Sequence, residues 1–299
     1  MPDFIDAENR IKELFPKGSF FYFKDKKYQV ALCGKPRPSK GECKTDVYIK
    51  GIDDKGEVIE LKISVKKENA DFLENKISLT RAKEIFGEDA SNIIKKCTLS
   101  IQNKLSADYL VYFDGFGRTK KHSIKLGWKF ELVNKLGGDK SDIIELTDKQ
   151  KHDVFAGINL PENKRNSTVE GQIINNSGVA NYILNLENNN GNLTQKSCLE
   201  KLQPIKEFAE SQTVYFACKA LNYRYDEKKC DGPRPLAVYV DWFIDKGKLN
   251  ARLVYDKPLE HTGKDGKENL TECLKDLKIK RFDNLKKVLS PQIKSYFKQ

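Results

Sequence analysis

The sequence is poor in the residues from which zinc and disulfide sites are built. It contains only three histidines, and its cysteines are seven, an odd number, with no Cys-x-x-Cys pair among them. A structural zinc module needs four such ligands at short spacings, so we expect none here. We expect the cysteines to be free, partly buried thiols.

Long hydrophobic runs are also missing. No apolar stretch approaches the ~20 residues that span a bilayer, so we expect no membrane partner. Residues 1–6 are acidic at the start and lack the basic-then-apolar layout of a secretory signal. The expected location is therefore cytoplasmic.

The chain is globular in composition but strongly basic. Hydrophobic residues make up 38% and charged residues 32%, and 54 Lys and Arg stand against 43 Asp and Glu, a net charge of +11. A basic balance of this kind favours a polyanionic partner, with nucleic acid as the leading choice. A lysine-rich surface that only aids solubility is the alternative.

Hydrophobic periodicity predicts an α/β fold class. The first 115 residues give a helix, strands, a hairpin, a helix and a strand, at residues 4–15, 20–23, 28–33, 45–52 with 57–65, 69–86 and 107–113. The remainder is mixed. Helices are predicted at residues 147–155, 196–210 and 270–297, the last with a break at Pro291, and strands at 124–133, 213–221, 236–244 and 250–255, whereas 178–186 fits either.

The hairpin concentrates charged side chains on one face. Strand alternation places Glu60, Lys62, Ser64 and Lys66 together. If opposite residues have numbers that sum to about 109, Asp46 falls beside Lys62 to Ser64 and one diagonal step from Glu60. Hairpin geometry then brings two carboxylates and a lysine together.

Two carboxylates with a neighbouring ammonium suit Mg²⁺-assisted chemistry on a phosphate. Mg²⁺ is held by one or two carboxylates together with waters and phosphate oxygens, and an adjacent ammonium can stabilise the charge of the transition state. The alternative is a solvated hairpin face with cross-strand ion pairs, each contributing under ~1 kcal/mol.

These residues resemble a known superfamily. Asp46, thirteen residues and then Glu60-Leu61-Lys62, on a hairpin between two helices, look like the PD-(D/E)xK nucleases, and most like type II restriction endonucleases. The resemblance covers residues 1–115. It implies a mixed β-sheet nuclease core flanked by helices, and it leaves residues 116–299 as an α+β region that recognises the DNA target.

The resemblance also implies roles for individual residues. Asp46 and Glu60 would be metal ligands, Lys62 the catalytic lysine, and Glu13, or alternatively Glu8, an auxiliary carboxylate on the first helix. The implied activity is sequence-specific, Mg²⁺-dependent cleavage of double-stranded DNA, and a palindromic site would imply a homodimer.

The chain departs from the superfamily pattern in two ways. Thr45 stands where the name-giving proline would be. Ser64-Val65-Lys66 lies in the same strand and faces the same way, so a register shifted by one step would make Lys66 the catalytic lysine in place of Lys62. Two other functions stay open: a nucleic-acid-binding protein without catalysis, and a DNA-repair or structure-specific nuclease.

Overall fold

The chain folds into two compact units, each built from two separate segments. The structure, a computed structural model, describes residues 2–67, 72–75, 77–186 and 193–298. Unit 1 combines residues 1–71 with 146–212, and unit 2 combines residues 72–145 with 213–299. Within the described ranges, none of the helices has both the length and the apolar character needed to cross a membrane.

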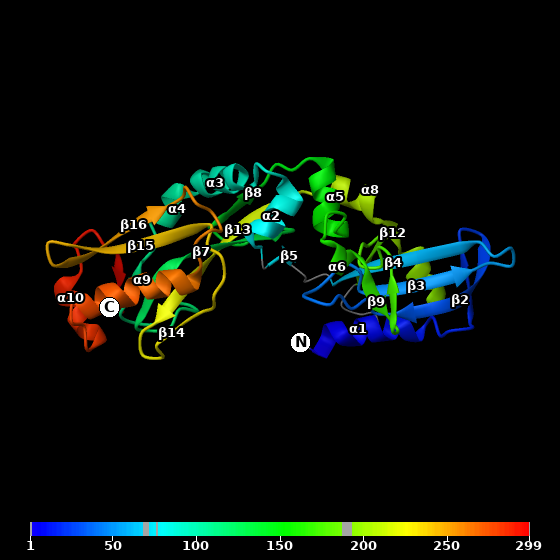
Figure 1. Ribbon diagram of the computed structural model, residues 1–299, viewed down its shortest axis with the longest axis horizontal. Helices are drawn as coiled ribbons and strands as arrows, with labels where there is room; N and C mark the ends of the chain where they lie inside the picture. Colours follow the sequence, from blue (N-terminus) through cyan, green and yellow to red (C-terminus); the bar gives the residue numbers. More distant parts are fainter. Residues whose placement is uncertain (1, 68–71, 76, 187–192, 299) are drawn as a thin grey trace. The chain divides into compact units, whose positions relative to one another are not determined.

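Unit 1 is a mixed sheet with helices packed against it (Figure 1). Its elements are α1 (Pro2–Glu13), β1 (Phe20–Phe23), β2 (Lys26–Gly34), β3 (Val47–Ile52), β4 (Val58–Lys67), α5 (Asp148–Ala156), α6 (Glu162–Arg165), β9 (Ser167–Val169), β10 (Gln172–Ile174), β11 (Tyr182–Leu186), α7 (Gln195–Glu200), β12 (Gln203–Pro204) and α8 (Ile205–Ser211).

The sheet of unit 1 has the strand order β1-β2-β3-β4-β11-β12. Strands β4 and β11 are parallel, whereas the other neighbours are antiparallel. One face is apolar because alternate residues of β3 and β4, among them Ile49, Leu61 and Ile63, point to it. Ile11 of α1 and Phe15, just after it, pack on this face and close the core.

Unit 2 is dominated by a second sheet with the strand order β14-β13-β7-β15-β16. Its elements are β5 (Phe72–Glu74), α2 (Leu79–Phe86), α3 (Ala90–Ser100), α4 (Gln102–Ser106), β6 (Val111–Tyr112), β7 (Ser123–Val133), β8 (Ser141–Ile143), β13 (Tyr215–Arg224), β14 (Lys229–Cys230), β15 (Val238–Asp245), β16 (Lys248–Val254), α9 (Gly263–Asp276), a 3-10 turn η1 (Phe282–Asn284), α10 (Leu285–Val288) and β17 (Ser295–Tyr296).

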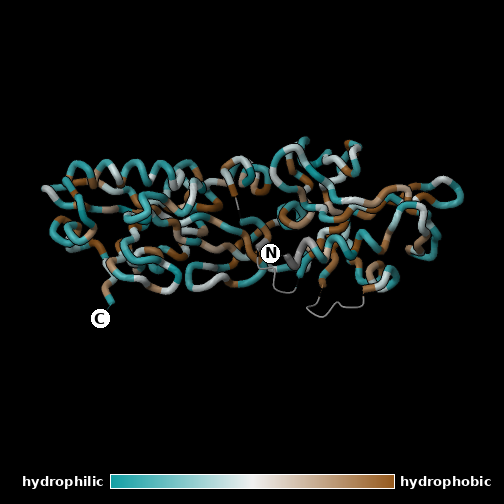
Figure 2. The backbone as a smooth tube through the Cα atoms, turned by 90° about the horizontal axis from the view of Figure 1, so that it is seen from below, coloured by the Kyte–Doolittle hydropathy of each residue, from teal (hydrophilic) through white to brown (hydrophobic). Residues whose placement is uncertain are grey.

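The core of unit 2 lies along β7, β13 and β15. Trp128 and Trp242 are fully buried there, and Phe130 stacks on Phe216 across β7 and β13. Helix α9 packs against β15 and β7. Figure 2 shows that hydrophobic and hydrophilic residues are interspersed along the backbone of both units.

The unit boundaries differ from a single division after residue 115. Strand β7, at residues 123–133, pairs with β5 and β6, which both precede residue 115. Residue 115 therefore lies in the loop between β6 and β7, two strands of the unit 2 sheet. Unit 1 is split into two segments because β4 pairs in parallel with β11. Parallel strands need a long crossover, and here that crossover contains the first segment of unit 2.

Two predicted helices are replaced by mixed structure. Of the helix predicted at residues 69–86, residues 69–71 and 76 lie outside the described part. Residues 72–74 form strand β5, and only the end is helical, as α2 capped by Ser78. The helix predicted at 270–297 is wrong beyond Asp276, where the chain forms η1, α10 and β17. In both segments apolar spacing alone favoured a helix, whereas pairing with distant strands decided otherwise.

The broad predictions of class are confirmed. The protein is mixed α/β, and all seven cysteines are free, two of them buried and five half-buried. Residues 178–186, which fitted either a helix or a strand, contain β11. The helix predicted at 196–210 is interrupted by the short strand β12, which ends at Pro204.

Candidate active site

The register of the β3–β4 hairpin sets which charged residues meet. Tyr48 is opposite Lys62 and Lys50 is opposite Glu60, so opposite residues have numbers that sum to 110. Continued by one pair, this register puts Asp46 beside Ser64, and the Asp46 amide donates to the Ile63 carbonyl at 2.8 Å. Glu60 is then four residues along β4, about 13 Å away at ~3.3 Å per residue. The structure does not bring Asp46 and Glu60 together.

Asp46 lies at the end of the sheet, just before β3 begins. Its Oδ2 accepts a hydrogen bond from the backbone amide of Val65 at 2.8 Å. Burial raises the pKa of this carboxyl from its ordinary 3.8 to about 6, against the opposing effect of the Val65 amide. A carboxylate held at the margin of ionisation is a feature of functional sites.

Three further side chains act on Asp46 through their charges. The ammonium groups of Lys66 and Lys35 lower the pKa of Asp46, and the carboxylate of Glu8 raises it. Glu8, on α1, forms an ion pair with Lys35, which follows β2. We call Asp46, Glu8, Lys35 and Lys66 the Asp46 cluster.

The helical period explains why Glu8, and not Glu13, reaches this cluster. Glu8 is three residues before Ile11 and seven before Phe15, so it shares the face of the helix that packs on the sheet. Glu13 is two residues from Ile11, which turns it to the opposite, exposed face. The auxiliary carboxylate first sought at Glu13 is therefore not at the site, whereas the alternative, Glu8, is.

Glu60 and Lys62 belong to a second group, around Tyr48. The Tyr48 hydroxyl donates a hydrogen bond to Glu60 Oε1, and burial, reinforced by this bond, raises the pKa of Tyr48. Burial lowers the pKa of Lys62, while the charge of Glu60 raises it. We call Tyr48, Glu60 and Lys62 the Tyr48 group.

Asn181 fixes the backbone of β4 beside this group. Its side chain accepts from the Lys62 amide at 2.7 Å and donates to the Glu60 carbonyl at 2.8 Å, and its own amide donates to the Lys62 carbonyl at 2.9 Å. The residue stands immediately before β11 and helps to dock that strand. Sequence reasoning missed it, because partners more than a hundred residues away leave no local pattern.

The burial of Asp46 predicts a stability effect with a defined pH dependence. Because the pKa is raised in the folded state, ionisation of Asp46 destabilises the fold as pH rises from about 4 to about 6, and the full effect is present above pH 6. We expect Asp46→Asn to raise the free energy of unfolding at pH 8 by roughly 2–3 kcal/mol. Near pH 4 the variant and the wild type should have the same free energy of unfolding.

Urea unfolding in EDTA at pH 8 and near pH 4 measures this effect. Lys50→Gln is a control, because Lys50 lies four residues further along, in β3 opposite Glu60, and is not among the charges that act on Asp46. Two results would contradict the raised pKa of Asp46. One is an Asp46→Asn variant that is less stable than wild type at pH 8, and the other is an equal change in the free energy of unfolding at both pH values.

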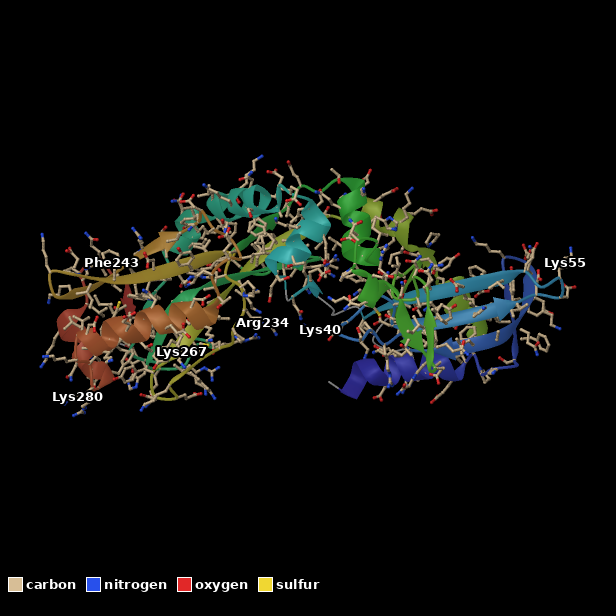
Figure 3. The ribbon with its side chains drawn as sticks, in the orientation of Figure 1. Lys40, Lys55, Arg234, Phe243, Lys267 and Lys280 are labelled. Carbon is tan, nitrogen blue, oxygen red and sulfur yellow. The ribbon has the colours of Figure 1, made fainter. Side chains whose placement is uncertain are left out.

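A basic loop leads into the Asp46 cluster. Residues 34–44 carry Lys35, Arg37, Lys40 and Lys44, with Glu42 as the only acid. The backbone of Arg37 pairs with Thr168 of β9, which anchors the loop within unit 1. Lys40 is exposed and is labelled in Figure 3. The loop therefore adds positive charge beside Asp46.

The net positive charge is concentrated in the other unit. Unit 1 contains 22 Lys and Arg against 21 Asp and Glu, a net charge of +1, whereas unit 2 contains 32 against 22, a net charge of +10. Together these counts give the +11 of the whole chain. The unit with the Asp46 cluster is nearly neutral, and the polyanion-attracting charge belongs to unit 2.

The oxygen donors at Asp46 and Glu8 match what Mg²⁺ requires of a protein. Among the residues that the structure describes, no group of three or more His, Cys, Asp and Glu side chains is placed to hold a metal ion. Asp46 and Glu8 are a pair of oxygen donors that influence each other through their charges. Mg²⁺ commonly uses one or two carboxylates and takes its other oxygens from water and phosphate, so this pair fits.

Comparison with known proteins gives no relative for this chain. No protein-family model matches it, and no curated protein and no solved structure is significantly similar to it.

Proposed function

We propose that the protein is a Mg²⁺-dependent endodeoxyribonuclease of the type II restriction enzyme kind, in which unit 1 cleaves and unit 2 holds the DNA. The observation that carries the proposal is the Asp46 cluster, where a half-buried carboxylate with a raised pKa is influenced by the charges of a second carboxylate and two lysines, two of which form an ion pair with each other. The net charge of +10 on unit 2 supports DNA as the partner.

In this proposal each side chain of the Asp46 cluster has a separate role. Asp46 and Glu8 would hold the Mg²⁺ ion. When bound, the ion polarises a phosphate and makes water a stronger nucleophile at neutral pH. Lys66 places its ammonium where it can stabilise charge on the phosphate oxygens, and Lys35 keeps Glu8 oriented through their ion pair.

This assignment adopts the shifted register of the acid-x-Lys pattern. Lys66 acts on the ionisation of Asp46, whereas Lys62 is influenced by Glu60 and lies opposite Tyr48. Ser64 then occupies the position that the unshifted pattern gives to Glu60. The second carboxylate comes from Glu8 on α1 rather than from the strand itself.

Metal dependence is the direct test of the proposed function. We expect Mg²⁺ and Mn²⁺ to support cleavage of a sequenced phage DNA into discrete fragments, and Ca²⁺ to support binding without cleavage, because its coordination geometry is looser. Discrete fragments would also indicate a fixed recognition site, and a palindromic site would favour action as a homodimer.

The other outcomes separate the competing functions. Retardation of the DNA without cutting in any metal indicates a nucleic-acid-binding protein, and nicking without regard to sequence indicates a repair or structure-specific nuclease. Full activity in EDTA would rule out the metal mechanism.

A further inference from the structure

A cluster of aromatic rings lies at one edge of the unit 2 sheet. Strand β17 pairs in parallel with β6, so that Tyr296 is opposite Tyr112. The ring of Tyr296 is 4.7 Å from that of Phe116 and 5.4 Å from that of Tyr109, and the last two are 6.1 Å apart. We call Tyr109, Phe116 and Tyr296 the Tyr296 cluster.

The Tyr296 cluster is open to solvent. Phe116 is 51% exposed and Tyr109 is 37% exposed, while Tyr296 is half-buried. The rings meet at interplanar angles of 53° to 69°, so they do not cover one another as a parallel stack would. Contiguous exposed rings on a basic unit are typical of an interaction surface.

Positive charge flanks these rings. Lys294 and Lys298 stand two residues to either side of Tyr296, and Arg118 stands two residues after Phe116; all three are exposed. The nearby acid Asp114 accepts a hydrogen bond from the backbone amide of Lys298 at 2.9 Å. Aromatic rings interspersed with cations match the chemistry of nucleotides, which combine flat bases with phosphates.

We propose that the Tyr296 cluster binds unpaired nucleotides of a DNA single strand, with bases stacked on Phe116 and Tyr109 and phosphates near Lys294 and Lys298. In a duplex the bases stack on each other and offer only their edges, whereas an unpaired base presents its whole face. The inference rests on the proposed function only in taking DNA as the partner, and it adds a second binding mode outside the cleaving unit.

Binding of a fluorescein-labelled 20-nucleotide oligothymidylate, measured by anisotropy with the full-length chain in EDTA, tests the proposal. We expect Phe116→Ala to weaken this binding about tenfold, since stacking contributes on the order of 1–3 kcal/mol per base. Binding of a 20-base-pair duplex should change less than about twofold. Replacing both Lys294 and Lys298 by alanine should flatten the dependence of log K on log salt by about 1.4.

Phe243→Ala is the matched control. Phe243 is also in unit 2, is 39% exposed, and has the Arg252 guanidinium 6.0 Å from its ring centre (Figure 3). We expect its replacement to leave oligothymidylate binding unchanged. Phe116→Trp should keep binding, which separates stacking from misfolding; a thermal melt checks that each variant is folded.

The opposite results would overturn the inference. These are equal losses in Phe116→Ala and Phe243→Ala, equal losses for single strand and duplex, or no binding of the oligothymidylate by wild type. Because binding is read in EDTA, a chain that never cleaves DNA can still bind the single strand. A chain that cleaves but does not bind the single strand would refute only this inference.

Discussion

Replacement of Asp46 by alanine is expected to lower metal-dependent DNA cleavage by about a thousandfold or more while DNA binding stays within a few-fold of wild type. Asp46 is the carboxylate around which Glu8, Lys35 and Lys66 gather, and loss of a metal ligand removes several kcal/mol of transition-state stabilisation. Affinity for DNA comes mainly from contacts of basic residues with phosphates, and Asp46 contributes none of these.

Glu60→Ala is the control that separates the two registers. Glu60 accepts a hydrogen bond from Tyr48 and lies about 13 Å along β4 from Ser64, the residue opposite Asp46, so its loss should lower cleavage by less than about tenfold. Rates of linear product formation in Mg²⁺ and gel-shift binding in Ca²⁺ measure both quantities. If Glu60→Ala is inactive while Asp46→Ala still cleaves, the unshifted assignment, with Glu60 as ligand and Lys62 as catalytic lysine, is restored. The Asp46 cluster would then not be the metal site.

Lys66→Ala is expected to reduce cleavage more than about a hundredfold, because its ammonium is the catalytic cation of the proposed site. Removal of one charge-stabilising group from a preorganised site typically costs ~3 kcal/mol in the transition state. The loss should appear in the single-turnover rate rather than in DNA affinity. Lys66→Arg tests geometry, since it keeps the charge but changes the shape of the donor.

Lys62→Ala is the matched comparison for Lys66→Ala. The two lysines are four residues apart on β4, and alternation places them on the same face. Within the described part of the chain, the Lys62 ammonium makes no hydrogen bond or ion pair, and burial lowers its pKa. Replacing Lys62 by alanine removes a partly buried ammonium that is costly to keep charged. The cleavage rate of the variant should therefore stay within about fivefold of the wild-type rate. If Lys62→Ala is inactive while Lys66→Ala still cleaves, Lys62 rather than Lys66 is the catalytic lysine.

Most of the fold could be predicted because its signals are local. The β3–β4 hairpin, β7, α5 and β15 were expected within a few residues of where they lie, since alternation and helical spacing record which face is buried. The sequence did not show that β11 pairs with β4, or that β5 and β6 join β7. Pairings between distant strands leave no periodic signal.

The sequence by itself determined the class of protein and the residue types of the candidate site. Its hydrophobic periodicity led to a mixed α/β protein, and its basic balance and the charged face of one hairpin led to the prediction of a polyanionic partner, with Asp46 as the leading carboxylate. These properties depend on composition and on the two-residue period of a strand, which no tertiary contact can change.

Only the tertiary structure decided which charges surround Asp46. A register shift of one residue moves the partner of Asp46 to Ser64 and brings Lys66 toward it, and the way α1 packs selects Glu8 over Glu13. The division of charge between the units depends on where the chain crosses from one to the other. Each of these outcomes is set by packing between segments far apart in sequence, and local patterns do not encode it.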